Sequence, residues 1–263
     1  MEHPNPAANA EAGAVRSIDR AVRILGLLEQ APQLRLTVTQ IARALGIPKS
    51  TTFNLCNALV DGQLLRRSHD GFQLGRRLVQ LGSAYVSSID LVREFYEVCR
   101  AAPADLGATI QLSVLDEGFN AVYLAYQDCG SGLRLGLSGG VGRVVPANCS
   151  ASGKALLAAL GDDALEARLA RVAKLERLTA ASIVSVPKLR RELAAIRERG
   201  FSTDEGGTVP GLSCVAAVAR TSYQDGDPVA ISITASAEAL NAKRSRQRRE
   251  TLLHIIALLQ ARL

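Results

Sequence analysis

The sequence predicts an α+β protein with a small N-terminal domain and a larger C-terminal domain. Residues 37–74 contain two short helical patterns followed by a hairpin pattern, which is the outline of a winged helix-turn-helix. Beyond Pro103, strand-like runs alternate with helical patterns, which is typical of an antiparallel sheet with helices against it. A chain of 263 residues is long enough for two domains with a core each.

Charge and cysteine content restrict the classes of protein to which the chain can belong. Of the formal net charge of +6, residues 1–77 carry +4, from ten basic and six acidic residues, so the excess lies with the predicted helix-turn-helix. Five cysteines without a CxxC spacing and only three histidines argue against a disulfide framework or a metal site. We expect no cofactor, a cytoplasmic location and no membrane span, because no apolar run approaches about 18 uncharged residues.

Two segments precede the helix-turn-helix. Residues 1–14 are rich in Ala, Asn and Pro without a helical period, which predicts a disordered tail. The N-terminal domain is expected to span residues 15–76. Its first helix begins with Ser17 as N-cap and Asp19 in the first turn, followed by apolar residues at helical spacing. We expect this helix to pack behind the helix-turn-helix.

The helix-turn-helix pattern itself follows. Thr39 is the predicted N-cap of its first helix, Gly46 allows the turn, and Pro48 opens the second helix. At about 100° per residue, the second helix has one buried face. That face comprises Thr52, Leu55, Cys56 and Leu59. The opposite face is polar, free of acidic residues, and comprises Lys49, Ser50, Phe53, Asn54 and Asn57.

This outer face has the chemistry of a DNA-reading helix. Asn side chains pair with the adenine edge, and Lys49 lies at the helix start, where backbone N–H groups also favour phosphate. A hairpin with an Asp70-Gly71 turn follows, and its adjacent arginines are expected to lie along the phosphate backbone. Alternatively, the polar face and the arginine pair are merely solvated. The predicted DNA contacts are Thr39, Lys49, Ser50, Thr51, Phe53, Asn54, Asn57, Arg66 and Arg67.

Residues 77–100 form one predicted linker helix, and residues 101–263 form the C-terminal domain. The linker has more apolar positions than a small domain needs, including Leu81, Tyr85 and Ile89, so we expect a partner subunit to cover some of them. The expected strands are 109–115, 121–126, 133–137, 214–219 and 229–234. The expected helices are 153–160, 164–173, 188–199 and 246–263.

From Ser17 to its end, the chain resembles the IclR family, the isocitrate-lyase-regulator type of bacterial transcription factor. The segments that carry the resemblance are SIDRAVRILGLLE, LTVTQIARALGIPKST, FQLGRRLVQLG, GRVVPANCSASGKALLA, RERGFSTDEGGTVPGLSCVAAVA and PVAISITA. The resemblance implies a winged helix-turn-helix, a linker helix, a GAF/PAS-like effector domain, and homodimers or homotetramers on a palindromic double-stranded DNA operator. Family members often have Arg where this chain has Asn54, so the operator read here is expected to differ.

The segment NCSASGKA, residues 148–155, is the candidate effector site. Small residues before a helix allow the backbone N–H groups of Ala151 to Lys154 to hold an anion, or they simply form a tight turn and an N-cap. The resemblance implies that this segment contributes to an effector site for a small organic or aromatic acid. The residues implied are Leu137, Val144, Val145, Ala151, Ser152, Gly153, Asp204, Cys214, Ser232 and Thr234.

Two other functions stay open. A cysteine hydrolase or amidase would use Cys149 or Cys214 as nucleophile with Asp204 or Glu205 as helper, but no histidine is placed as a base in the C-terminal half. The glycines at 139, 140 and 142 lack the lysine of a phosphate loop. A DNA-binding protein without a ligand is the second alternative, although the C-terminal half is larger than DNA affinity alone requires. We therefore expect a ligand-responsive regulator and no catalysis.

Overall fold

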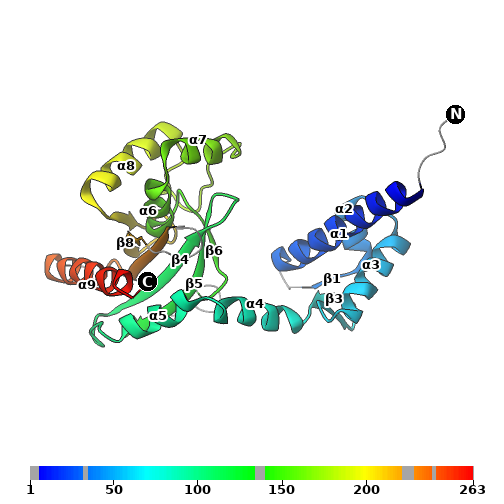
Figure 1. The fold of residues 1–263 in the computed structure, drawn as a ribbon, viewed down its shortest axis with the longest axis horizontal. Coiled ribbons are helices and arrows are strands. Elements are labelled where there is room, and N and C mark those ends of the chain that lie inside the picture. The colour runs from blue at the N-terminus through cyan, green and yellow to red at the C-terminus, as the bar shows by residue number, and fades with distance from the viewer. Residues whose placement is uncertain (1–5, 32–34, 134–139, 221–227, 239–240, 263) are drawn as a thin grey trace. The chain divides into compact units, whose positions relative to one another are not determined.

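A computed structural model describes residues 6–31, 35–133, 140–220, 228–238 and 241–262, without the side chains of residues 6–14 (Figure 1). The chain divides into two compact units, Met1–Ser88 and Ile89–Leu263. Among the described residues, no helix is both long and apolar enough to cross a bilayer. The same residues contain no cluster of side chains suited to a metal ion.

The N-terminal unit is a winged helix-turn-helix, as expected. Its elements are α1 (Pro6–Gln30), β1 (Arg35–Leu36), α2 (Val38–Leu45), α3 (Lys49–Asp61), β2 (Leu65–Ser68), β3 (Gly71–Leu74) and α4 (Arg77–Ser87). The strands form an antiparallel sheet in the order β1-β3-β2, and β2 and β3 are the predicted hairpin. The strand β1 was not expected, because two residues are too short for an alternating pattern.

Local sequence explains the ends of α2 and α3. Thr37, rather than the predicted Thr39, caps α2, and it forms a capping box with Gln40. Gly46 ends α2 with a positive φ of 66°, a conformation that side chains with a Cβ disfavour. Pro48 precedes α3 as expected. The core of the unit includes Ile24, Leu28, Ile41, Cys56, Leu65 and Phe72. Burial raises the pKa of the Cys56 thiol to about 11.

Other expectations about the N-terminal half are also wrong, among them Ser17 as an N-cap, because Ser17 lies inside α1. Residues 6–14, expected in a disordered tail, belong to α1, because alanines favour a helix and Pro6 is tolerated in a first turn. The linker expected at 77–100 is two helices, α4 and α5 (Asp90–Cys99). The Ser88 hydroxyl donates to the Tyr85 carbonyl at 2.7 Å and Ile89 is extended, so the helix stops there.

The C-terminal unit begins with α5 and contains a six-stranded antiparallel sheet in the order β6-β5-β4-β9-β8-β7 (Figure 1). The strands are β4 (Ala108–Leu115), β5 (Asn120–Cys129), β6 (Val144–Pro146), β7 (Ser202–Glu205), β8 (Leu212–Ala219) and β9 (Val229–Ser236). The helices are α6 (Ala151–Ala159), α7 (Asp162–Ala170), α8 (Val186–Arg199) and α9 (Ala242–Gln260). The short edge strands β6 and β7 were not expected, and most of the strand expected at 133–137 lies outside the described residues.

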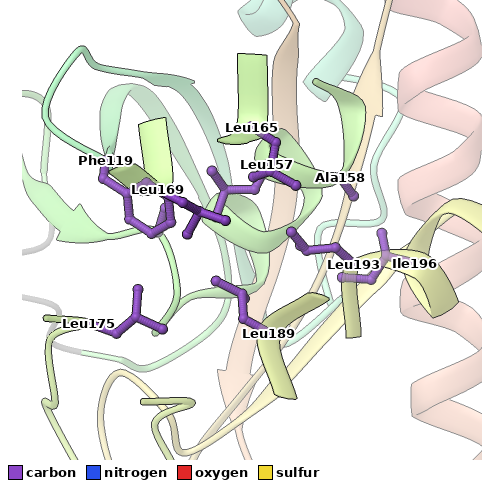
Figure 2. Close-up of a cluster of buried hydrophobic side chains, with 10 residues drawn as sticks. Phe119, Leu157, Ala158, Leu165, Leu169, Leu175, Leu189, Leu193 and Ile196 are labelled. Carbon is purple, nitrogen blue, oxygen red and sulfur yellow. The ribbon is translucent and has the colours of Figure 1, made fainter. Parts of the chain in front are cut away.

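Helices cover both faces of this sheet. Cys214, Ala216 and Val218 of β8 pack against α6. Successive strand residues point to opposite faces, so Ser213 and Val215 point to the other side, where they share a cavity with Arg248 of α9. Figure 2 shows the cluster that fixes α6, α7 and α8 to one another. Its members include Phe119, Leu157, Leu165, Leu169, Leu189, Leu193 and Ile196.

Candidate functional sites

The outer face of α3 is open to solvent. Thr52, Cys56 and Leu59 are buried, as the helical projection predicted, whereas Leu55 of the same predicted face is half-buried. Lys49, Ser50, Phe53 and Asn54 are exposed, whereas Thr51 and Asn57 are half-buried. Thr39 lies in the first turn of α2 and is exposed. The N-terminal unit therefore presents Asn54 and its neighbours to a partner with no rearrangement of the core.

The two arginines of the hairpin have different surroundings. The Arg67 guanidinium donates to the Asn57 side-chain oxygen at 2.7 Å. It also lies over the rings of Phe53 and Phe72, at 5.5 and 5.9 Å from their centroids. Arg66 is exposed on the same strand. Arg67 thus links the hairpin to α3, which the sequence did not predict, because hydrogen bonding between these two elements depends on the tertiary fold.

A small cavity lies at the N-terminus of α6. Its volume is about 30 Å³, well below the roughly 150 Å³ that holds a benzene-sized molecule. Four of the predicted effector residues line it: Ala151, Asp204, Cys214 and Thr234. Residues that the sequence did not point to also line it: Gln111, Tyr123, Arg143, Ser150, Thr208, Val209 and Leu212.

The start of α6 has features of both interpretations of residues 148–155, the anion site and the tight turn with an N-cap. Ser150 is the N-cap, and its hydroxyl accepts from the Gly153 N–H at 3.0 Å. A Cβ at Gly153 would collide with the backbone of Ala147, so this glycine is required for packing. The N–H groups of Ala151 and Ser152 have no acceptor among the described residues, which leaves two donors for an anion at the helix start.

Polar groups on strands β4, β5, β8 and β9 and on α6 contact one another beside the cavity. The Tyr123 hydroxyl lies 3.0 Å from the Ser152 hydroxyl, and the Thr234 hydroxyl donates to the Gln111 side-chain oxygen at 3.1 Å. Thr234 also lies 3.2 Å from the Cys214 sulfur. Burial raises the pKa of Tyr123 to about 12 and that of Cys214 to about 11. Both groups are therefore uncharged at pH 7, so neither repels a bound anion.

Asp204 is held by protein groups. Its carboxylate lies 3.7 Å from the Lys154 ammonium and accepts from the Thr208 N–H at 3.3 Å. Burial raises the pKa of Asp204, while Lys154 acts in the opposite direction. The Lys154 ammonium is itself buried and donates to the Thr203 carbonyl at 2.7 Å. Lys154 thus offsets part of the charge of Asp204, which reduces its repulsion of a ligand carboxylate without removing it.

The other predicted effector residues do not line this cavity. Ser152 and Gly153 are buried in α6, Val145 is buried in β6, and Val144 is largely exposed. Ser232 lies on the same face of β9 as Thr234, and its buried hydroxyl has no partner among the described residues. Leu137 lies outside the described residues.

Arg143, which was not among the predicted effector residues, is a cation that could bind an acidic effector. It lines the cavity, is half-buried, and its guanidinium lies 6.0 Å from the centre of the Tyr123 ring. An arginine at a cavity that is also lined by Ala151, whose backbone N–H is free among the described residues, favours a carboxylate. No periodic pattern marks Arg143, since it precedes the short strand β6.

A winged helix-turn-helix with an open polar helix face, in one chain with a sheet domain that holds a polar cavity, defines a DNA-binding regulator with a sensor domain. The family model for the bacterial transcriptional regulator IclR C-terminal domain matches residues 83–258, and the IclR helix-turn-helix model matches residues 17–69. The chain belongs to the IclR family of transcriptional regulators, which binds DNA and small-molecule effectors.

Individual relatives agree with this assignment. The chain is 30% identical over 240 residues to the transcriptional repressor AllR of Klebsiella pneumoniae, which covers 90% of this chain and 85% of AllR. It is 32% identical over 205 residues to the transcriptional regulator XynR of Escherichia coli, covering 77% and 79% of the two chains. An IclR homologue from Microbacterium hydrocarbonoxydans, solved with 4-hydroxybenzoate, shares the fold with a TM-score of 0.70 and 22% identity over 93% of this chain and 99% of its own.

The hydrolase alternative is not supported, because the relatives are named transcriptional regulators and repressors. The cysteines also lack activation. The Cys149 thiol is buried and donates to the Glu176 carbonyl, and the raised pKa of Cys214 keeps it protonated. In the described part of the chain, the histidines lie in the hairpin turn and in α9.

Proposed function

We propose that this protein represses transcription from an inverted-repeat operator, and that a small monocarboxylic acid at the α6 cavity controls its affinity for DNA. The observation that carries the ligand class is the lining of the cavity, which includes Arg143 and Ala151, whose backbone N–H has no acceptor among the described residues. These donors favour an anion, and Asp204 disfavours a second carboxylate. The homologue solved with 4-hydroxybenzoate supports the same class of ligand, and the relatives named as repressors support the direction of control.

The proposal includes a change in the cavity. A volume of about 30 Å³ does not hold an aromatic acid, so binding requires lining side chains to move outward. Arg143, Thr208 and Val209 are the lining residues best placed to move, because they are half-buried or exposed. The free and bound states therefore differ in shape. A ligand that binds one of two shapes more tightly shifts the population between them, and can thereby change the affinity for DNA.

A symmetric oligomer is part of the proposal. One recognition helix reads only a few base pairs, so paired half-sites are needed for specificity. Apolar side chains of the N-terminal unit are solvent-exposed and suit a subunit interface. They are Val15, Ile18 and Val22 of α1 and Val79, Leu81 and Tyr85 of α4. Ile89 does not belong to this set, contrary to expectation, because it is 2% exposed in the C-terminal unit.

The test uses the full chain. Selection from a random duplex library should return an inverted repeat, and titration with 4-hydroxybenzoate or aliphatic monocarboxylates should lower the affinity for it. Arg143→Met should abolish the response to the acid while leaving operator affinity unchanged. Arg177→Met is the matched control, since Arg177 is exposed and does not line the cavity. An unchanged response in Arg143→Met, or a selected site without symmetry, would contradict the proposal.

A further inference from the structure

A second cavity lies on the opposite face of the sheet, between α9 and strands β7 to β9. Its volume is about 140 Å³, several times that of the α6 cavity. Its lining includes Phe201, Ser213, Val215, Ile233, Ser245 and Arg248. Cys214 lines both cavities, so β8 separates them.

Arg248 is the unusual group in this cavity. The residue is 3% exposed, and its Nε and Nη2 atoms have no hydrogen-bond partner among the described residues. Lys154, which is also a buried cation, differs, because Asp204 and the Thr203 carbonyl satisfy it. A buried charge without a partner is strongly unfavourable, and proteins avoid it unless another group completes the site. Burial lowers the pKa of Arg248, and the nearby Arg244 lowers it further.

The rest of the lining indicates what would complete the site. Phe201, Val215 and Ile233 provide an apolar surface, and the hydroxyls of Ser213 and Ser245 provide further donors. Two arginines and one acid, Glu205, line the cavity, so its balance of charge suits a single negative charge. A volume near 140 Å³ is close to that of an engineered cavity, about 150 Å³, that binds benzene.

We propose that this cavity is a second ligand site, which binds a small monocarboxylate with an apolar body through an ion pair with Arg248. The carboxylate accepts from Nε and Nη2, the geometry in which guanidinium groups hold carboxylates most strongly. The ring or alkyl part of the ligand lies against Phe201, Val215 and Ile233. This site is independent of the effector cavity proposed at α6.

Calorimetry on the full chain with benzoate as the probe tests this proposal. Arg248→Met should weaken this binding event about tenfold or more. Arg246→Met, an exposed arginine of the same helix outside the cavity, should not change it. Arg143→Met should also leave it intact, which separates this site from the α6 cavity. Benzamide, the neutral analogue, should bind at least about tenfold more weakly than benzoate.

Three results would overturn the proposal: no benzoate binding at millimolar concentration, equal binding to wild type and Arg248→Met, or equal binding of benzoate and benzamide. Thermal unfolding without ligand gives a separate test. Because Arg248→Met removes an unpaired buried charge, its melting temperature should equal or exceed that of wild type. A marked decrease would mean that Arg248 has a structural partner, and would also overturn the proposal.

Discussion

The two units present their polar groups in opposite ways. On α3, Asn54 is exposed and its side chain is free of contacts with the core. Around the α6 cavity, Tyr123, Ser152 and Thr234 are buried and bonded to protein groups. A DNA-reading surface must exchange water for base edges at little cost, whereas a ligand-sensing site gains strength and selectivity from a low dielectric. Substitutions on α3 should therefore alter binding alone, and substitutions around the cavity should alter binding and stability together.

The largest expected effect is a difference in lost stability between substitutions of a buried and an exposed phenylalanine. Phe95 is fully buried in α5, so Phe95→Ala should lower the free energy of unfolding of the C-terminal unit by about 3–5 kcal/mol. Phe53 is 41% exposed, and Phe53→Ala should cost less than about 1 kcal/mol while weakening DNA binding. Urea unfolding and gel-shift titration measure the two quantities. Comparable losses of stability in the two variants would contradict the contrast between the units.

Asn54→Ala tests the reading face. One base pairing of this kind contributes about 1–3 kcal/mol of discrimination, so the variant should lose selectivity for the operator and keep its affinity for unrelated DNA. Circular dichroism should be unchanged, because Asn54 does not contribute to the core. A variant as selective as wild type would assign sequence reading to another face.

Arg66 and Arg67 should now differ, although the sequence predicted the same role for both. Arg66→Ala should weaken binding to all sequences equally and reduce the dependence of affinity on salt by about one phosphate contact. Arg67→Ala should also change which sequences are preferred, because it releases Asn57 and Phe53 on α3. Binding at several salt concentrations to operator and unrelated duplexes distinguishes the two. Identical behaviour would mean that the contact with α3 has no part in reading.

The smallest effect concerns pH. Burial raises the pKa of Asp204 above its ordinary value of 3.8. The folded state therefore binds this proton more tightly than the unfolded chain, and that contribution to stability is present below pH 3.8 and is lost as pH rises through the folded pKa. Relative to Asp204→Asn, wild type should lose stability across that window, by about 1.4 kcal/mol for each pKa unit of difference. Melting temperatures from pH 3.5 to 7 would show it, and parallel curves would contradict it.

Periodicity predicted the buried face of α3 correctly, because a short amphipathic helix packs on one side only. Periodicity failed at the end of α4, where the apolar spacing continues although the helix stops. Apolar spacing runs on through Ser88 and Ile89, and only the serine hydroxyl bound to a preceding carbonyl marks the end of α4. The cap of α2 was available from the sequence, since Gln40 follows Thr37 by three residues.

The candidate effector site was predictable only in part. Ala151, Asp204, Cys214 and Thr234 came from the family resemblance, and all of them line the cavity. Gln111 and Tyr123 were missed because they reach the site through strand register, Gln111 through its pairing with Ser232. The Lys154 side chain extends to Asp204, a contact between α6 and β7 that the local sequence does not indicate. Long-range pairing is not readable from local composition.

The distribution of thiols has a practical consequence. Cys56 is the one cysteine of the N-terminal unit, and it lies wholly inside its core with a pKa of about 11. The other cysteines belong to the C-terminal unit. A maleimide reagent can reach Cys56 only when the helix-turn-helix opens, so its rate of labelling reports the local unfolding of that unit. Peptide mass mapping after brief labelling would then time the opening of the DNA-reading unit separately from that of the sensor, with and without operator.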